Sequence, residues 1–259
     1  MRAALIVMQH TKTSERLSLN RSLLGQRIVI IGGTSGFGLA TAKAASAEGA
    51  SVIVASSKKA NVDRALTELP ASAEGHVLDI TEESAVREFF STLGEFDHLV
   101  ITAGESLDLG EFAVLDLERA RRFFETRFWG SIAAAKHAAR RISPSGSIIL
   151  TNGIIGVRPQ KGWVVAAAIT GAVEAVSRAL AVELAPIRVN LVCAGVVRTD
   201  LWRDMPEQER NELFDKAGRA LPVGRVGEPE DLAEAYLYLM RERFSTGAMI
   251  VVDGGGVLV

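Results

Sequence analysis

The chain has 259 residues, within the range of one α/β domain, and 48% of them are hydrophobic while only 6% are aromatic. Its formal net charge is -2, which gives no electrostatic reason to expect a nucleic acid or a membrane as partner. The single Cys193 excludes an internal disulfide and fits a reducing compartment, and the apolar run at residues 3–8 is too short to cross a bilayer. We therefore expect a cytoplasmic protein without a membrane segment.

The first strand and the turn after it organise the rest of the chain. Residues 1–25 are predicted to be an N-terminal arm, and one domain is expected over residues 26–259. The run Ile28-Val29-Ile30-Ile31 lacks polar alternation, which is typical of a strand buried on both faces of a parallel sheet. Glycines follow at positions 32, 36 and 38, and a helix is predicted over residues 39–48.

The glycines have two explanations. Any tight corner between a strand and a helix can use glycine, because glycine permits sharp turns. The same residues also let a phosphate group approach the backbone N–H groups that open a helix. A second strand, predicted at residues 51–55, completes a β-α-β unit and favours the phosphate explanation.

The second strand ends in Ser56-Ser57-Lys58-Lys59 and has no acidic residue there. In a dinucleotide-binding fold this strand end faces the adenosine ribose, where a carboxylate would bind the 2′-hydroxyl. Two hydroxyls and two lysines suit a 2′-phosphate instead, which predicts a preference for NADP(H) over NAD(H). The alternative is that the lysines are the solvated start of the next helix, predicted at residues 61–69.

The remaining elements alternate between strand and helix. We predict strands at 76–80, 97–102, 147–151, 188–193 and 249–252, and helices from 81 and at 116–141, 163–185 and 229–240. A polar insertion rich in Glu and Arg spans residues 198–219. This order predicts a doubly wound parallel α/β sheet of the Rossmann type, with ligands at the carboxyl ends of the strands. The histidines show no spacing of a metal site.

With these residues the chain resembles the short-chain dehydrogenase/reductase family after residue 25. The matching motifs are Gly32, Gly36 and Gly38, Asp79, Ala103-Gly104, Arg188-Val189-Asn190, Gly195 with Thr199, and Asp253-Gly254-Gly255. The resemblance implies an oxidoreductase of a small carbonyl or alcohol substrate, a homodimer or homotetramer, and a mobile substrate-binding loop at residues 198–222. The cofactor-binding residues that we expect are Gly32, Thr34, Ser35, Gly36, Phe37, Gly38, Ser56, Ser57, Lys58, Asp79, Ile80, Ala103, Gly104, Val197 and Thr199.

The chain departs from the family's pattern at the catalytic positions. Family members use a serine, a Tyr-x-x-x-Lys pair and an asparagine, and the tyrosine exchanges a proton with the substrate oxygen. The resemblance places Ala166 at the tyrosine, Thr170 at the lysine and Arg127 at the asparagine, while the serine falls on Asn152 or Gly153. We therefore expect an atypical active site.

The catalytic candidates are Arg127, Asn152 and Thr170. Arg127 could hold a carboxylate or an oxyanion, although an arginine in mid-helix is often solvated or ion-paired. Asn152 could donate a hydrogen bond to a carbonyl oxygen, and Thr170 could bond a ribose hydroxyl. Other charged residues near the expected pocket are Glu105, Arg158 and Lys161. Arg158 and Lys161 lie in a predicted loop, so the alternative is that they are ordinary exposed charges.

The two tyrosines do not restore the missing pair. Tyr236 and Tyr238 both fall in the last predicted helix, and neither is followed by lysine four positions later. We interpret them as core or subunit-contact residues.

Two functions are consistent with the sequence. The first is an oxidoreductase that uses NADPH with a relocated or solvent-derived proton source, which the complete glycine turn and nicotinamide end favour. The second is a protein that binds NADP(H) without turnover, as a redox sensor or non-catalytic subunit. The simultaneous replacement of the four catalytic side chains favours this second function.

Overall fold

The computed structural model describes residues 22–104 and 110–259, so most of the predicted N-terminal arm lies outside the described residues. The described residues form a seven-stranded sheet in the order β3-β2-β1-β4-β5-β6-β7, and all neighbouring strands are parallel. This topology confirms the predicted doubly wound fold. The strands are β1 (Arg27–Ile31), β2 (Ser51–Ser56), β3 (Glu74–Val77), β4 (Phe96–Ile101), β5 (Ile142–Gly153), β6 (Arg188–Ala194) and β7 (Met249–Val252).

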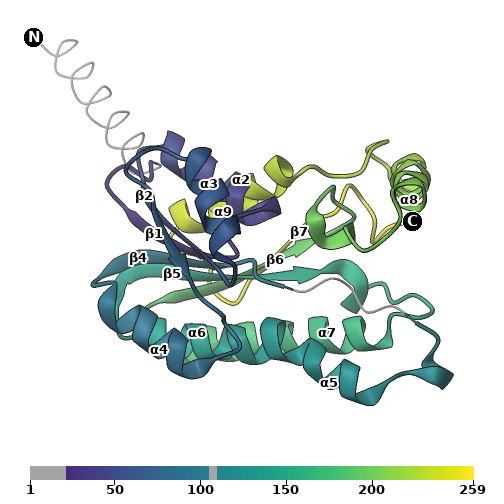
Figure 1. Cartoon of the computed structure of the whole chain (residues 1–259), viewed down its shortest axis with the longest axis horizontal. Coiled ribbons are helices and arrows are strands. Elements are labelled where there is room, and N and C mark those ends of the chain that lie inside the picture. The colour runs from purple at the N-terminus through teal and green to yellow at the C-terminus, as the bar shows by residue number, and fades with distance from the viewer. Residues whose placement is uncertain (1–21, 105–109) are drawn as a thin grey trace, which may run out of the picture.

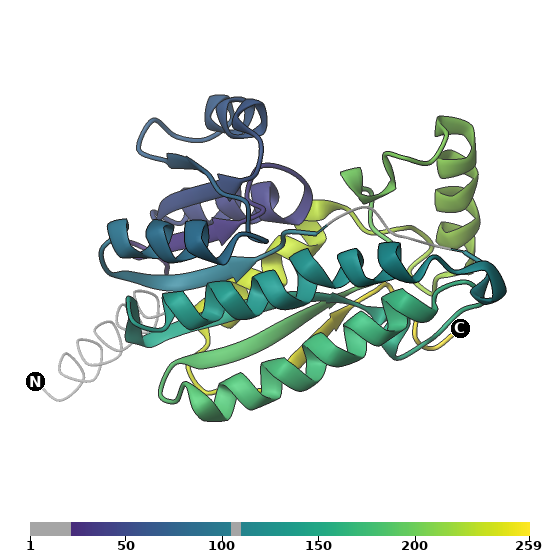
Figure 2. The same cartoon turned by 60° about the horizontal axis from the view of Figure 1, so that its bottom comes forward.

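Helices cover both faces of the sheet (Figure 1). On one face lie α2 (Gly36–Ala47), α3 (Lys59–Thr67) and α9 (Pro229–Arg241). On the other face lie α4 (Glu83–Thr92), α5 (Leu117–Phe124), α6 (Ser131–Ala138) and α7 (Val164–Glu183). Helix α8 (Glu207–Ala220) stands beyond the carboxyl ends of β5 and β6, at the end of the molecule where the site is found (Figure 2).

Burial on both faces explains the apolar strands. In β1, Val29 and Ile31 pack into the core beneath α4, α6 and α7, whereas Ile28 and Ile30 pack into the core beneath α2 and α9. Every side chain of this run from Ile28 to Ile31 therefore leaves water, which is why the sequence shows no polar alternation.

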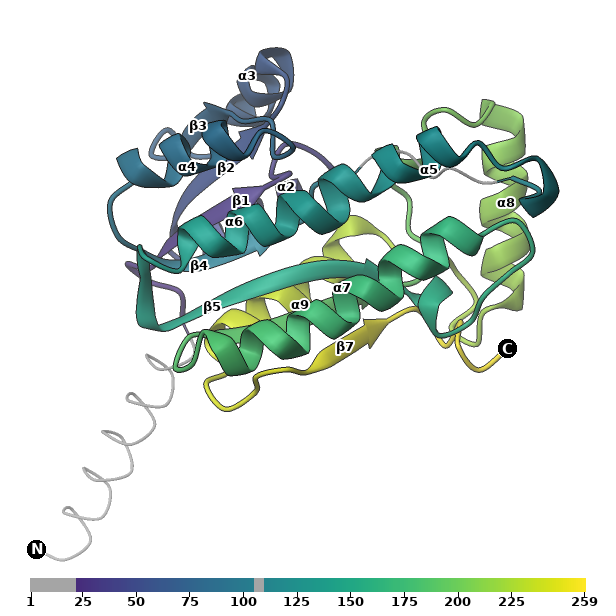
Figure 3. The same ribbon diagram turned by 90° about the horizontal axis from the view of Figure 1, so that it is seen from below.

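The helix predicted over residues 116–141 is not uniform. It consists of α5, a π-helical segment η2 (Glu125–Gly130) and α6, which together lie beside α7 (Figure 3). Hydrogen bonds in a π-helical segment join residues five apart instead of four, so its side chains point in other directions than in a regular α-helix, and such segments are frequent at functional sites. Arg127 lies within this one.

One predicted strand was shifted, and one region predicted only as an insertion contains helices. The strand predicted at residues 76–80 is β3, which begins at Glu74 and ends at Val77. It is an edge strand whose residues are half-buried or exposed, so the apolar pattern used to place it is weak. The polar insertion at residues 198–219 contains a short 3₁₀ helix, η4 (Asp200–Trp202), and α8.

Among the described residues, α7 is the one helix that is long and apolar enough to cross a membrane by length and composition, with 20 residues and a mean hydropathy of 1.5. In the fold its Val165, Ile169 and Val173 are part of the core under the sheet. A core helix meets the same criterion of length and composition, so this feature alone does not indicate a membrane span.

A buried histidine joins the amino-terminal halves of three neighbouring segments. His98 Nδ1 lies 2.8 Å from Ser147 Oγ, and His98 Nε2 lies 2.6 Å from Gln26 Oε1. Burial lowers the pKa of His98 to about 3, and the positive charges of Arg188 and Arg243 act in the same direction. His98 is therefore neutral at neutral pH and has a hydrogen-bond partner on each ring nitrogen.

We expect the stability of the protein to fall as the pH falls below about 6, because the unfolded chain then binds a proton at His98 that the folded chain does not. This group alone contributes about 1.4 kcal/mol per pH unit to the loss of unfolding free energy. Urea unfolding of the wild type and of His98→Gln at pH values from about 7 down to about 4 measures the slope. The variant has no titrating ring, so equal slopes for the two proteins would contradict the assignment.

Candidate functional site

Two adjoining cavities lie at the carboxyl ends of the strands. The first has a volume of about 350 Å³ and lies over the ends of β1, β2 and β4. It is lined by all the predicted cofactor-binding residues except Gly38 and Val197. Further lining residues that the sequence did not indicate are Ile31, Asn61, Leu78, Thr102, Thr126, Thr151, Asp200, Leu201 and Arg203.

The glycine turn brings the first turn of α2 directly onto the end of β1. A Cβ atom on Gly38 would lie 2.3 Å from the carbonyl oxygen of Gly32, so a side chain is excluded there. Gly32 and Gly36 have φ values of +89° and +48°, a backbone region that favours glycine. The helix therefore begins at Gly36, earlier than predicted, and its amino-terminal end lines the first cavity without an acidic residue in its first turn.

The amino-terminal end of α2 is suited to an anion. Its first backbone N–H groups have no partners within the helix, and the helix dipole places partial positive charge there. Because Gly36 and Phe37 line the first cavity, these groups are available to a phosphate. Gly38 does not line the cavity; it lies in the same turn and packs against the backbone of Gly32.

The two lysines after β2 have different environments. Lys58, immediately before α3, lines the first cavity together with Ser56, Ser57 and Asn61. Lys59 Nζ lies 2.7 Å from Asp63 Oδ1, one turn along α3, and Lys59 is not among the lining residues. Of the two lysines, only Lys58 is therefore placed at the end of the cavity where the sequence predicts a 2′-phosphate.

The second cavity has a volume of about 370 Å³ and lies between the ends of β5 and β6, the start of α7, and α8. Its wall is mostly hydrocarbon and includes Phe123, Ile155, Trp163, Ala166, Ile169, Val173, Trp202 and Leu221. Five residues line both cavities, so the cavities meet at Phe37, Arg127, Thr151, Thr199 and Leu201. Val197, predicted to bind the cofactor, lines the second cavity.

Arg127 reaches this junction from the π-helical segment. A Cβ atom on Gly104 would lie 2.5 Å from Arg127 Cζ, so the guanidinium lies against the bare backbone of Gly104. The guanidinium carbon also lies 5.8 Å from the centre of the Phe123 ring. The structure therefore places a permanent positive charge where the polar and apolar cavities meet.

Asn152 and Thr170 line the second cavity but are bound to each other and to the backbone. Asn152 Nδ2 donates a hydrogen bond of 2.9 Å to the carbonyl oxygen of Thr170, and Thr170 Oγ1 donates one of 2.9 Å to Ala167. A Cβ atom on Gly156 would lie 2.5 Å from Thr170 Oγ1, so the short helix η3 (Ile154–Gly156) packs directly on this hydroxyl. The bond from Thr170 to a ribose hydroxyl stays a prediction, because Thr170 does not line the first cavity.

The other charged candidates are placed as follows. Arg158 lines the second cavity, and its Nη1 donates a hydrogen bond of 2.5 Å to the carbonyl oxygen of Gly256, which ties the C-terminal segment to the cavity wall. Lys161 is exposed and does not line either cavity. Glu105 lies outside the described residues.

A buried pair of hydroxyls, which the sequence did not indicate, forms part of the floor of the junction. Thr151 Oγ1 donates a hydrogen bond of 2.6 Å to the carbonyl oxygen of Ile101 and lies 2.7 Å from Tyr236 Oη. Tyr236 belongs to α9 and is fully buried, which confirms its predicted place in the core, whereas Tyr238 is exposed. Burial raises the pKa of the Tyr236 hydroxyl, so it stays protonated and can donate to Thr151.

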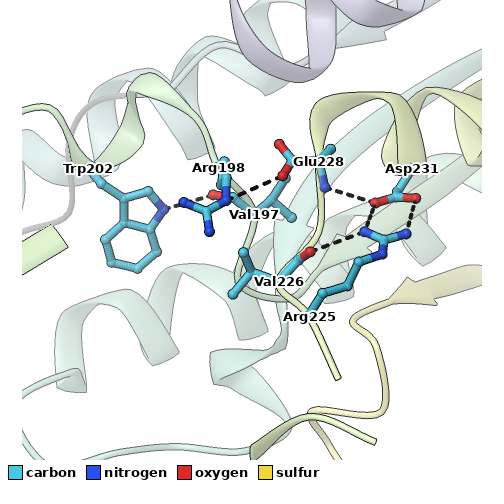
Figure 4. A network of polar contacts seen from close by, with 7 residues as sticks. All are labelled: Val197, Arg198, Trp202, Arg225, Val226, Glu228 and Asp231. Atoms are coloured by element: carbon cyan, nitrogen blue, oxygen red, sulfur yellow. Dashed lines mark hydrogen bonds and ion pairs between the residues drawn. The ribbon is translucent and has the colours of Figure 1, made fainter. Parts of the chain in front are cut away.

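The segment predicted to be the substrate loop covers the second cavity. Arg198 Nε lies 3.3 Å from Glu228 Oε1, and Trp202 Nε1 donates a hydrogen bond of 3.0 Å to the carbonyl oxygen of Val197 (Figure 4). The Arg198 guanidinium also lies over the ring of Phe214 in α8, 4.6 Å from its centre. These contacts hold η4 and α8 against the start of α9.

An ion pair lies three residues beyond the C-terminal end of this segment. Arg225 Nη1 and Nη2 lie 2.6 and 2.8 Å from the two carboxylate oxygens of Asp231 (Figure 4). The hydrogen bonds from Arg225 and from the backbone N–H of Glu228 lower the pKa of Asp231 to about 2. Arg198 at the start of the segment and Arg225 just after its end are therefore both attached to the start of α9.

Comparisons with known proteins extend over nearly the whole chain. A family described as enoyl-(acyl carrier protein) reductase matches residues 32–256. Short-chain dehydrogenase/reductase ATR9 of Stachybotrys chlorohalonatus is 38% identical over 255 residues, which cover 92% of this chain and 99% of that protein. A solved small-chain dehydrogenase in complex with NADPH is 38% identical with a TM-score of 0.81, covering 91% of this chain and 100% of its own. The reductase/Diels-Alderase MalC of Malbranchea aurantiaca is 29% identical with a TM-score of 0.86, covering 93% of this chain and 100% of its own.

We expect Tyr236→Phe to lower the free energy of unfolding by about 1 kcal/mol, because it removes a buried hydroxyl that is hydrogen-bonded to Thr151. Urea unfolding measures the change. The matched control is Tyr238→Phe, which removes a hydroxyl from an exposed ring in the same helix and is expected to leave stability unchanged. A loss of equal size in both variants would contradict the role given to the Tyr236 hydroxyl.

Proposed function

Because this chain belongs to the short-chain dehydrogenase/reductase family, we propose that it binds NADP(H) in the first cavity and reduces the carbonyl group of a small molecule in the second. The observation that carries this proposal is the meeting of the two cavities at Arg127, Thr151 and Thr199. A cofactor and a substrate in adjoining cavities can bring their reacting atoms together, which is the main requirement of hydride transfer.

The residues of the first cavity fit a dinucleotide phosphate. The amino-terminal end of α2 offers backbone N–H groups to the diphosphate, and Gly36 keeps a side chain out of its way. Ser56, Ser57 and Lys58 would hold the 2′-phosphate, with Asp79 beside the adenine. The NADPH bound to the relative that is 38% identical supports the choice of a nicotinamide cofactor.

The residues of the junction suit the charge that develops during a reduction. When bound, NADPH supplies a hydride, which adds to the carbonyl carbon and leaves negative charge on the oxygen. Arg127 would stabilise that charge, because its guanidinium is always positive and lies at the junction. Thr199 and Val197 would hold the nicotinamide carboxamide from the other side.

The proton for the oxygen has no evident source in the wall of the second cavity. Among the described residues that line it, there is no Asp, Glu, His, Cys, Lys or Tyr side chain. Ala166, at the place that the resemblance gives to the family's tyrosine, is a buried methyl group in this wall. We therefore propose an atypical mechanism in which water supplies the proton.

The same observation favours a second candidate function. A protein that binds NADP(H) without turnover, as a redox sensor or a non-catalytic subunit, would need the first cavity and no proton donor in the second. It differs from the reductase in that no carbonyl compound would cause oxidation of NADPH.

We expect Lys58→Ala to weaken NADPH binding by about tenfold and to leave NADH binding unchanged, because a charged hydrogen bond to the 2′-phosphate is lost. Titration of cofactor fluorescence measures both affinities. The matched control is Lys59→Ala, since Lys59 is paired with Asp63 and does not line the cavity. Equal affinity of the wild type for NADPH and NADH would remove the phosphate assignment.

We expect Arg127→Ala to lower kcat by about a hundredfold, because it removes the positive charge beside the developing oxyanion. Cofactor affinity, measured by the same fluorescence titration, should change little. The loss of NADPH absorbance with a panel of carbonyl compounds gives the rate. Unchanged turnover would remove Arg127 from the site, and the absence of turnover by the wild type with every compound would favour the non-catalytic function.

A further inference from the structure

One face of α7 forms an apolar wall of the second cavity. Ala166, Ile169 and Val173 follow one another at helical spacing and all three line the cavity. Each is less than 5% exposed, so a ligand that reaches them lies inside the domain and not on its surface. The side chain of Ala166 is a single methyl group, and any larger side chain at this place would take up part of the cavity.

Other lining residues of the second cavity are also hydrocarbon, and several are aromatic. Phe123 comes from α5, Trp163 from the residue before α7, and Trp202 from η4. Trp202 is held by its hydrogen bond to Val197 and packs edge-on against Phe214 with 6.2 Å between ring centres. Its indole N–H is therefore already satisfied, and the ring presents carbon to the cavity.

The polar side chains that line the second cavity are fewer than the apolar ones, and several of them are held by contacts within the protein. Arg127 stands at the junction with the first cavity, and Arg158 is bound to the carbonyl oxygen of Gly256 in the C-terminal segment. Asn152 and Thr170 use hydrogen bonds within the protein. If a ligand carried many hydroxyl groups, those facing the apolar side chains of α7 would lose their hydrogen bonds to water, which weakens binding. An apolar ligand instead gains about 25 cal/mol for each Å² of its surface that leaves water.

From this arrangement we infer that the substrate is a bulky, largely apolar carbonyl compound of about the size of two fused rings, with its ring system on the face formed by Ala166, Ile169 and Val173. The carbonyl group is directed to the junction at Arg127. Ala166 is then a specificity-determining residue, because its small size keeps this space open. The inference rests on the proposed function and names the class of substrate for the same site.

The test uses 2-acetylnaphthalene as the bulky apolar carbonyl compound and dihydroxyacetone as the small polar one. Calorimetric titration into the protein saturated with NADP⁺, which cannot reduce the compounds, measures the affinity for each of them, and loss of NADPH absorbance in a separate assay measures turnover. We expect the wild type to bind 2-acetylnaphthalene at least tenfold more tightly than dihydroxyacetone. Replacement of Ala166 by Val, Leu and Phe should weaken binding of 2-acetylnaphthalene in steps, from about threefold to more than tenfold, without changing the affinity for NADPH.

The matched control is Ala168→Phe, on the exposed face of the same helix, which should leave both affinities unchanged. Thermal unfolding shows which variants are folded, and Ala166→Val adds only two carbon atoms, so the series does not depend on the phenylalanine variant. Equal affinity for 2-acetylnaphthalene across the series would overturn the inference. So would a wild type that binds NADPH but not 2-acetylnaphthalene, and that result would leave the proposed function in place. Binding of 2-acetylnaphthalene without oxidation of NADPH would support the apolar ligand site and contradict the proposed reaction.

Discussion

The close approach of α2 to the end of β1 is the constraint on which the first cavity depends. The distance of 2.3 Å between a hypothetical Cβ of Gly38 and the carbonyl oxygen of Gly32 leaves no room for any side chain. On the other side, a Cβ on Gly32 would lie 2.5 Å from the backbone nitrogen of Ala103, which follows β4. Two strands and one helix thus meet through bare backbone. The backbone N–H groups at this meeting point offer partial positive charge to an anion without the need for ionised side chains.

The two cavities differ because they are built from different parts of the sheet. The first lies over β1, β2 and β4, whose ends carry glycine, serine and threonine, whereas the second lies between β5, β6 and the apolar helices α7 and α8. At their junction, a π-helical segment that carries Arg127 meets the end of β5, where the hydroxyl of Thr151 is hydrogen-bonded to the hydroxyl of Tyr236 in α9. A charged group, a hydroxyl and an apolar wall therefore meet in one place, although they come from distant parts of the chain.

Local patterns in the sequence were sufficient for the fold and for most of the first cavity. The β-branched run from Ile28 predicts the buried strand, the glycines after it predict the turn that lines the first cavity, and the last strand was predicted with the bounds of β7. Features that depend on distant contacts were missed. Thr151 and Tyr236 are separated by 85 positions, and no local pattern pairs them. The π-helical segment has the composition of an ordinary helix, and Lys58 and Lys59 are distinguished by the cavity, which Lys58 lines and Lys59 does not.

Ala166 and Thr170 show how one helix face can combine support with open space. They are one turn apart on α7 and both line the second cavity, but Thr170 is engaged in hydrogen bonds with Asn152 and Ala167, whereas Ala166 presents only a methyl group. The hydrogen bond from Asn152 joins β5 to α7 at the point where the cavity begins, and so it holds the wall at a constant distance from the sheet. Because this hydrogen bond holds the backbones of β5 and α7 in place, neighbouring side chains do not collapse into the space beside the Ala166 methyl group. The space beside Ala166 is therefore bordered by a helix that a hydrogen bond ties to β5, and its width at this point depends on the small side chain of Ala166.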